Sequence, residues 1–200
     1  PAGAGQVAKA CNQLLVGSNV RAVAEAILLA ERSGLIDPAV MREAVTGGAN
    51  LIVLPELCST GYFFSNRQDA FEHAQLIPGG PSAQLWIDFA SKHSVYIVAG
   101  LAERDGMRLF NTSILVGPDG FIGKYRKAHL WNLEKLWFTP GDLGFPVFDT
   151  PIGRIGMLIC WDIWFPEVPR ILSQQGADII CSVNNWVWTP PPLFDEAGKC

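Results

Sequence analysis

The 200-residue chain has no strong excess of charge of either sign and no long uninterrupted apolar segment. Its formal net charge is −4, and its largest basic cluster is Lys124-Tyr-Arg-Lys127, which is too little positive charge to favour nucleic acid. Its apolar runs are far shorter than the roughly 18–20 residues that a membrane helix needs. We therefore expect neither a nucleic acid nor a membrane as a partner. The length predicts one ordinary domain, with at most a fragment of another.

Closely spaced cysteine pairs are also missing. The five cysteines, at positions 11, 58, 160, 181 and 200, include no pair with the spacing of zinc ligands. No Gly-x-Gly-x-x-Gly motif follows a predicted strand, so the sequence offers no dinucleotide-binding loop. An odd number of unpaired thiols is typical of a reduced protein. We expect a cytoplasmic protein with at most one functional thiol and with no metal or organic cofactor.

The predicted secondary structure changes near residue 47. Residues 6–33 are rich in Ala and Leu and lack proline, and residues 37–45 begin with Asp37-Pro38, so both stretches are predicted to be helical. From Gly47 onward, apolar strands, turns and helices alternate, with hairpins mixed among strand–helix–strand units. This pattern predicts a layered α/β fold over 47–200, preceded by a helical segment over 1–46.

Seven short stretches are predicted to be strands, and because several of them are apolar throughout, both faces of the sheet are expected to be covered. The predicted strands are 51–54, 95–101, 109–116, 121–125, 147–148, 152–159 and 177–183. Helices are predicted over 81–93 and over 166–175, each with a proline near its start. Asp105-Gly106 predicts a hairpin, and residues 128–145 are predicted to be an irregular loop rich in aromatics.

A chemically active residue follows each of three predicted strands, namely Glu56, Lys127 and Cys160. Because ligands bind at strand ends in layered α/β folds, these three side chains are expected to meet. The helix predicted after Cys160 is expected to lower the thiol pKa through its positive end. A carboxylate that takes the thiol proton, a thiolate that attacks a carbonyl or nitrile carbon and an ammonium that stabilises the new negative charge form a coherent mechanism.

Each of these residues taken alone also has an ordinary structural explanation. Cys160 could be a small buried apolar residue, Glu56 a helix cap and Lys127 a solvated loop charge. Their matching positions at strand ends favour a shared site. His129 could border that site or stabilise its own loop, and the many tryptophans could pack in the core or line an apolar pocket.

Three blocks of residues 48–199 resemble the nitrilase, or carbon–nitrogen hydrolase, superfamily. They are GANLIVLPELCSTGY at 48–62, KYRKAHL at 124–130 and LICWDIWFPE at 158–167, and all three in this order are far more specific than one alone. The resemblance implies a four-layer α-β-β-α sandwich that pairs with a second subunit, as a homodimer or a larger homo-oligomer. It also implies that Glu56 is the general base, Lys127 the transition-state stabiliser and Cys160 the nucleophile.

The same resemblance implies further site residues. Glu134 in WNLEKLWF at 131–138 matches the family's second glutamate, and the backbone N–H of Trp161 would complete the oxyanion site. Asn185 and Trp186, after the last predicted strand, are expected to bind substrate.

The reaction implied is hydrolysis of a non-peptide carbon–nitrogen bond through a thioester on Cys160. Asp162, which follows Cys160-Trp161, favours a small-molecule amide or N-carbamoyl amine as substrate over a nitrile. A nitrilase acting on nitriles remains an alternative, and so does a truncated or chimeric chain without activity.

A second resemblance concerns residues 1–45, which are similar to the start of the helical domain of β-hydroxyacid dehydrogenases. Lys9 and Asn12 match that family's catalytic lysine and substrate-binding asparagine, but no nicotinamide site accompanies them. Residues 1–46 are therefore interpreted as a structural segment and the chain as a fusion of two gene fragments, while a 3-hydroxyacid dehydrogenase fragment that acts through Lys9 is a further alternative. Because strands of the nitrilase type have no counterpart at either end, both sheets are expected to be incomplete, with unpaired edges.

Overall fold

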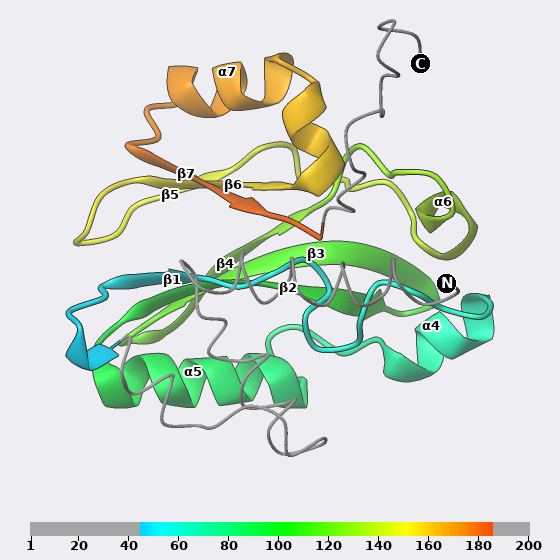
Figure 1. Cartoon of the computed structure of the whole chain (residues 1–200), viewed down its shortest axis with the longest axis horizontal. Coiled ribbons are helices and arrows are strands. Elements are labelled where there is room, and N and C mark those ends of the chain that lie inside the picture. Colours follow the sequence, from blue (N-terminus) through cyan, green and yellow to red (C-terminus); the bar gives the residue numbers. More distant parts are fainter. Residues whose placement is uncertain (1–44, 186–200) are drawn as a thin grey trace, which may run out of the picture.

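The computed structural model describes residues 45–185, which fold into four layers (Figure 1). Helix α5 (Pro81–His93) covers the outer face of a four-stranded sheet. A three-stranded sheet packs on the other face of that sheet, and helix α7 (Glu167–Gln174) covers it from outside. The predicted α-β-β-α order is therefore confirmed. The helical segment predicted over 1–46 lies almost wholly outside the described residues.

The four-stranded sheet has the order β1 to β4, with β1 parallel to β2 and the other neighbours antiparallel. Its strands are β1 (Leu51–Val53), β2 (Tyr96–Asp105), β3 (Arg108–Gly117) and β4 (Gly120–Arg126). The predicted hairpin joins β2 to β3, where Asp105 pairs with Arg108. The next hairpin sets the end of β4 beside the middle of β3, because Thr112 pairs with Arg126.

The three-stranded sheet has the order β5-β6-β7, with β5 antiparallel and β7 parallel to β6. Its strands are β5 (Val147–Phe148), β6 (Ile155–Ile159) and β7 (Ile179–Val183). β6 begins three residues later than predicted because residues 150–153 form a turn. In that turn Gly153 has a φ of 121°, and its N–H donates to the Thr150 carbonyl oxygen at 3.1 Å.

Alternate residues of the long strands face opposite layers, as the two-residue period of a strand requires. On β2, Ile97 and Leu101 belong to the core that includes Trp86 of α5, whereas Val98 belongs to the core between the two sheets, with Met157 of β6. All of these side chains are fully buried. Burial of each large apolar side chain contributes roughly 1.5–3 kcal/mol, so the two cores hold the layers together.

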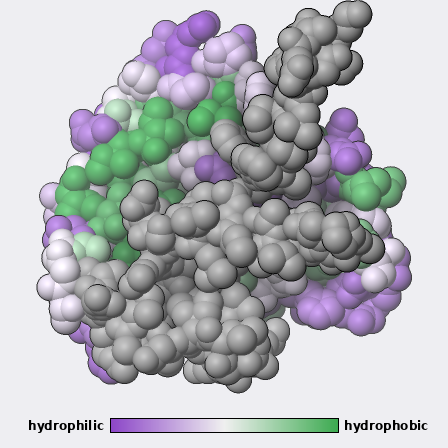
Figure 2. Space-filling view, viewed as in Figure 1, coloured by the Kyte–Doolittle hydropathy of each residue, from purple (hydrophilic) through white to green (hydrophobic). Residues whose placement is uncertain are grey.

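β1 lies at one edge of the four-stranded sheet and β7 at one edge of the three-stranded sheet, within residues 45–185. Partly buried Leu51, Val53 and Ile179 lie on them, and Figure 2 shows an apolar surface on the side of the sandwich where these strands lie. No helix in this described part of the chain is long and apolar enough to cross a membrane.

Three short elements are absent from the sequence predictions. They are α4 (Arg67–His73), α6 (Glu134–Trp137) and the 3₁₀ turn η1 (Cys160–Trp164). α4 has a capped start, because the Asn66 side chain accepts a hydrogen bond from the Asp69 N–H at 3.0 Å. All three are two turns or fewer, which is too short to leave a clear apolar period in the sequence.

A buried charge network ties the end of β4 to the β2–β3 hairpin and to the loop after β4. The Arg126 guanidinium donates to both Glu103 oxygens at 2.6 and 2.9 Å, to Asp105 at 3.0 Å and to Asp142 at 2.8 Å. Burial alone would raise the pKa of Glu103, but hydrogen bonds from Arg126 and Lys124 lower it below its usual value. Arg126 therefore holds both ends of the 127–142 loop in place.

Replacement of Arg126 is expected to destabilise the fold strongly. Arg126→Leu leaves the nearly buried Glu103 carboxylate without its main partner, and the free energy of unfolding is expected to fall by about 3 kcal/mol in urea titrations. Arg108→Leu is the matched control: Arg108 also reaches Asp105 and Asp142 at 3.0 Å, but its side chain is 53% exposed, so the loss should stay below about 1 kcal/mol. Equal losses in the two variants would contradict this account of the network.

Candidate active site

Two carboxylates share one buried ammonium at the centre of the site. Lys127 Nζ lies 2.7 Å from Glu56 Oε1 and 2.7 Å from Glu134 Oε2. Glu56, Lys127 and Glu134 are 0%, 1% and 2% exposed, so water screens their charges little. The structure thus brings together three of the four residues predicted to be catalytic, although they come from distant parts of the sequence.

Glu56 follows β1 in a segment that lies directly against β2. The Gly100 N–H donates to the Pro55 carbonyl at 3.3 Å, and the Cys58 N–H donates to the Gly100 carbonyl at 3.0 Å. A Cβ on residue 100 would lie 2.7 Å from the Glu56 Cα, so this approach requires glycine. The backbone of Glu56 is therefore held by the sheet.

Lys127 directly follows β4 and is fixed by its backbone on both sides. Its N–H donates to the Asn111 carbonyl at 2.8 Å, and its carbonyl accepts the Gly141 N–H at 2.8 Å. Glu134 begins α6, inside the loop predicted to be irregular, and its Oε2 accepts the Trp131 N–H at 2.7 Å. This short helical turn places the Glu134 carboxylate against the Lys127 ammonium.

Asn111 on β3 is a fourth buried polar group that the sequence predictions missed. Its Nδ2 donates to Glu56 Oε1 at 2.8 Å and to Glu134 Oε1 at 2.6 Å, and the residue is 1% exposed. A signal was present in the sequence, because Asn111-Thr-Ser113 places three polar residues in a row within a predicted strand.

Cys160 directly follows β6 in a strained backbone conformation. Its φ is 47°, in the left-handed region that L-residues with side chains rarely adopt, and it begins η1. The residue is 7% exposed. Non-glycine residues with such backbone angles persist only where their surroundings hold them, and they cluster at functional sites.

The Cys160 thiol is protonated in the resting protein at neutral pH. Burial and the negative charge of Glu56 raise the pKa of the thiol to about 12, while Lys127 and the backbone N–H of Asn185 have the opposite effect. The expectation that a following helix lowers this pKa is therefore wrong. Only the short η1 turn follows Cys160, and α7 begins at Glu167.

Glu56 has the properties of a base for this thiol. Burial raises the pKa of Glu56 and Glu134 raises it further, whereas Lys127 and Asn111 lower it, and the net direction is upward. Its Oε2 has no hydrogen-bond partner within residues 45–185. A buried carboxylate oxygen that is free and more basic than usual is suited to accept a proton from a neighbouring group.

Lys127 keeps its charge in the buried site. Burial alone would lower the pKa of Lys127, but the charges of Glu56 and Glu134 outweigh this effect and raise it. The ammonium can therefore stabilise negative charge that develops near Cys160.

Asp162 holds the turn that presents Cys160. This fully buried carboxylate accepts hydrogen bonds from the Tyr125 hydroxyl at 2.8 Å, from the Ile159 N–H at 3.0 Å and from the His129 N–H at 3.0 Å. The His129 Nδ1 also lies 2.8 Å from Asp162. The sequence assigns Asp162 only to the choice between amides and nitriles, whereas the structure shows that it ties the end of β6 to the end of β4.

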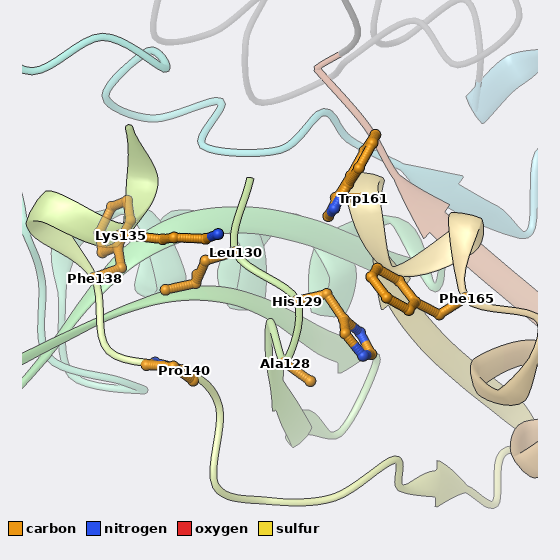
Figure 3. A pocket seen from close by; sticks show the side chains of 8 residues that line it. All are labelled: Ala128, His129, Leu130, Lys135, Phe138, Pro140, Trp161 and Phe165. Carbon is orange, nitrogen blue, oxygen red and sulfur yellow. The ribbon is translucent and has the colours of Figure 1, made fainter. Parts of the chain in front are cut away.

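A cavity of about 510 Å³ is lined by sequence neighbours of Lys127, Glu134 and Cys160, but by none of these three residues and not by Glu56 (Figure 3). Trp161, next to Cys160, and Lys135, next to Glu134, stand on opposite sides of it, and His129 stacks on Phe165 with 3.7 Å between the ring centroids. The other lining residues are mostly apolar: Ala128, Leu130, Phe138, Pro140 and Phe165. A mostly apolar hollow with a few polar groups beside titratable residues is typical of a small-molecule site.

The remaining predicted binding residues have different outcomes. Trp161 lines the cavity, and the backbone of Asn185 reaches the Cys160 sulfur. Trp186 lies outside the described residues. No group of three or more His, Cys, Asp or Glu side chains between residues 45 and 185 is placed to hold a metal ion.

The role of Asp162 in holding the turn can be tested by thermal or urea denaturation. Asp162→Asn keeps the shape of the side chain but replaces one accepting oxygen with an NH₂ group, which cannot accept the hydrogen bonds made there. The free energy of unfolding is therefore expected to fall by about 2 kcal/mol. Asp149→Asn is the control, because Asp149 pairs with Arg154 at 2.9 Å but is 85% exposed, and little change is expected. Wild-type stability in Asp162→Asn would rule out this role.

Several proteins that are similar to this chain are named as nitrilases or amidases. The family model described as carbon-nitrogen hydrolase matches residues 6–196. The chain is 51% identical over 152 residues to a nitrilase of Pyrococcus abyssi, covering 76% of this chain and 58% of that protein. It is 37% identical over 170 residues to an omega-amidase of Homo sapiens, and the match covers 78% of this chain and 59% of the human protein. It is 37% identical over 147 residues to an N-carbamoylputrescine amidase of Arabidopsis thaliana, and the match covers 70% of this chain and 49% of the plant protein.

Solved structures show the same fold. A carbon-nitrogen hydrolase from Helicobacter pylori G27 matches with a TM-score of 0.67 and 31% identity, covering 73% of this chain and 52% of that one. An amidase from Nesterenkonia sp. AN1 matches with a TM-score of 0.57 and 22% identity, and the match covers 70% of this chain and 56% of the amidase. The chain spans about half to three fifths of the length of the curated relatives it matches. By its family match and its relatives, the chain belongs to the carbon–nitrogen hydrolase family.

Proposed function

We propose that this protein hydrolyses the carbon–nitrogen bond of a small-molecule amide or N-carbamoyl amine through a thioester on Cys160. The observation that carries the proposal is the buried ammonium of Lys127 held between Glu56 and Glu134, with the charges of Glu56 and Lys127 acting on the Cys160 thiol. Relatives named as amidases support amide chemistry.

The first half of the reaction forms the thioester. Glu56 Oε2 takes the thiol proton while the Cys160 sulfur bonds to the carbonyl carbon, because a thiol with a pKa of about 12 is not a thiolate beforehand. The carbonyl oxygen becomes an oxyanion, which the Lys127 ammonium and the Trp161 backbone N–H stabilise. Glu56 then returns the proton to the nitrogen as the carbon–nitrogen bond breaks, and the amine leaves.

The second half releases the acid. Glu56 takes a proton from a water molecule, whose oxygen bonds to the thioester carbon. The carbon–sulfur bond then breaks, and the proton on Glu56 returns to the Cys160 sulfur. Glu134 takes no proton in this scheme. It shares the ammonium with Glu56 and keeps Lys127 at a fixed distance from both carboxylates.

The cavity is the proposed binding site of the substrate. It is lined by Trp161 and Phe165 on one side and by the loop that carries Glu134 on the other (Figure 3). An apolar acyl chain or amine would bury its surface there, while the reacting carbon lies at Cys160. Asn185 and Trp186 would add contacts from the segment after β7.

Nitrile hydrolysis is the second candidate. The relative with 51% identity is named a nitrilase, and thiol attack on a nitrile carbon uses the same base and ammonium. A matched amide and nitrile with the same acyl chain separate the two. Faster turnover of the nitrile would replace the amide proposal and would keep the roles of the four side chains.

The assignment of base and nucleophile predicts a clear pattern among variants. Cys160→Ala and Glu56→Gln are each expected to lower kcat/KM on a panel of short amides by at least about a thousandfold, because each removes a group that acts directly on the reacting atoms. Steady-state ammonia release measures the rate. Far-ultraviolet circular dichroism checks that each variant is folded.

Cys181→Ala is the matched control for the nucleophile. Cys181 is a buried cysteine on β7 whose pKa burial raises to about 12, but no site carboxylate or ammonium acts on it. Its replacement should keep most of the activity. Turnover that persists in folded Cys160→Ala, or that disappears equally in Cys181→Ala, would contradict the assignment.

A further inference from the structure

We propose that Asn111 is a positioning residue for this reaction. Its side-chain amide links the two carboxylates of the site and fixes Glu56 so that one oxygen is left free to take the thiol proton. This inference rests on the proposed function, because it assigns Asn111 to the same reaction. Neither the predicted catalytic residues nor the predicted binding residues include it.

The backbone places Asn111 beside the ammonium. It lies on β3, between β2 and β4, and its carbonyl accepts the Lys127 N–H at 2.8 Å. Its Nδ2 then reaches the same two carboxylates that Lys127 binds, Glu56 at 2.8 Å and Glu134 at 2.6 Å. A buried strand in the centre of the sheet is a rigid support for such a group.

The chemistry of the contacts determines how the amide is oriented. Ionised carboxylates only accept hydrogen bonds, so the NH₂ group of Asn111, and not its oxygen, faces them. Both hydrogens on Nδ2 are used, one for each carboxylate. Removal of this group would leave two buried like charges with Lys127 as their shared donor, and each would lose a charge-assisted hydrogen bond.

The same contacts make the two oxygens of Glu56 different. Oε1 accepts from both Lys127 and Asn111, whereas Oε2 has no hydrogen-bond partner in the described part of the chain. Rotation of the carboxylate would break both bonds at Oε1. Asn111 therefore helps to keep Oε2 as the oxygen available to the Cys160 proton.

Asn111 also favours the ionised form of Glu56. The titratable groups that act on or face Glu56 are Lys127, Glu134, Cys160 and Tyr62. Of these, only Lys127 is a cation, and hydrogen bonding from Asn111 lowers the pKa of Glu56 in the same direction as Lys127 does. A base works when it is ionised, so loss of Asn111 should move the acidic limb of kcat/KM to higher pH.

Three variants of the full chain test this role. Asn111→Ala removes both donors, Asn111→Ser keeps a single donor, and Ser113→Ala is the control. Ser113 is fully buried on the same strand, but its hydroxyl contacts Met157 at 3.4 Å and not a carboxylate. The readouts are the pH profile of kcat/KM for an amide substrate and the ¹³C NMR titration of the Glu56 carboxyl, assigned with Glu56→Gln.

We expect Asn111→Ala to lower kcat/KM at neutral pH by about ten- to a hundredfold, which corresponds to the loss of one or two hydrogen bonds to charged groups. Its acidic limb and its Glu56 titration should both move to higher pH. Asn111→Ser should lie between Asn111→Ala and the wild type, and Ser113→Ala should keep the wild-type profile. If Asn111→Ala does not fold, Asn111→Ser should still move the acidic limb of kcat/KM and the Glu56 titration to higher pH.

The two proposals fail in different ways. A folded wild type that turns over no amide or nitrile refutes the proposed function, while the NMR titration still tests the contact between Asn111 and Glu56. An unchanged Glu56 titration and acidic limb in the folded Asn111 variants overturn the present inference, even if activity falls, because a purely structural role would give that result.

Discussion

The ion pairs between the buried Lys127 ammonium and the two glutamates are the interaction on which the site depends. A carboxylate or ammonium buried alone costs several kcal/mol, so none of the three charges is stable there without the others. Their mutual attraction sets the distances of 2.7 Å on both sides of the ammonium. The same attraction keeps a cation next to a neutral thiol, where negative charge would develop during attack.

The layers of the fold serve to bring these groups to one place. Glu56 and Lys127 end strands of one sheet, Cys160 ends a strand of the other, and Glu134 comes from the loop that Arg126 fastens through Asp142. Buried polar networks lie on both sides of the cluster: Arg126 with Glu103 toward the β2–β3 hairpin, and Asp162 with its donors under the Cys160 turn. The strained backbone of Cys160 is held by the second network.

Much of this architecture could be predicted from the sequence, because apolar strands and the residues that follow them leave a local signal. The layer order, the meeting of Glu56 with Lys127 and the inclusion of Glu134 are confirmed as geometry. Asn111 and the structural role of Asp162 could not be predicted, since both depend on which strands lie side by side. The thiol pKa was predicted in the wrong direction, because the sequence shows a helix after Cys160 but shows neither its burial nor the charge of Glu56.

Other predictions concern properties that the fold does not address. The homo-oligomeric state, the cytoplasmic location and the interpretation of residues 1–46 as a segment of dehydrogenase origin stay predictions. The origin of residues 1–46 has its own test in the source locus: intact homologous genes with the same junction between codons 40 and 55 would rule out a fusion of gene fragments.

The most direct test of the central claim is to map the covalent intermediate. The full chain is mixed with an amide that it hydrolyses, quenched in acid during turnover, digested and analysed by mass spectrometry. We expect the peptide that contains Cys160 to carry the acyl group as a thioester, seen as an increase in its mass. Treatment with hydroxylamine should cleave the thioester and abolish this increase. Turnover with no acyl group on Cys160, or with the group on a different residue, would contradict the claim.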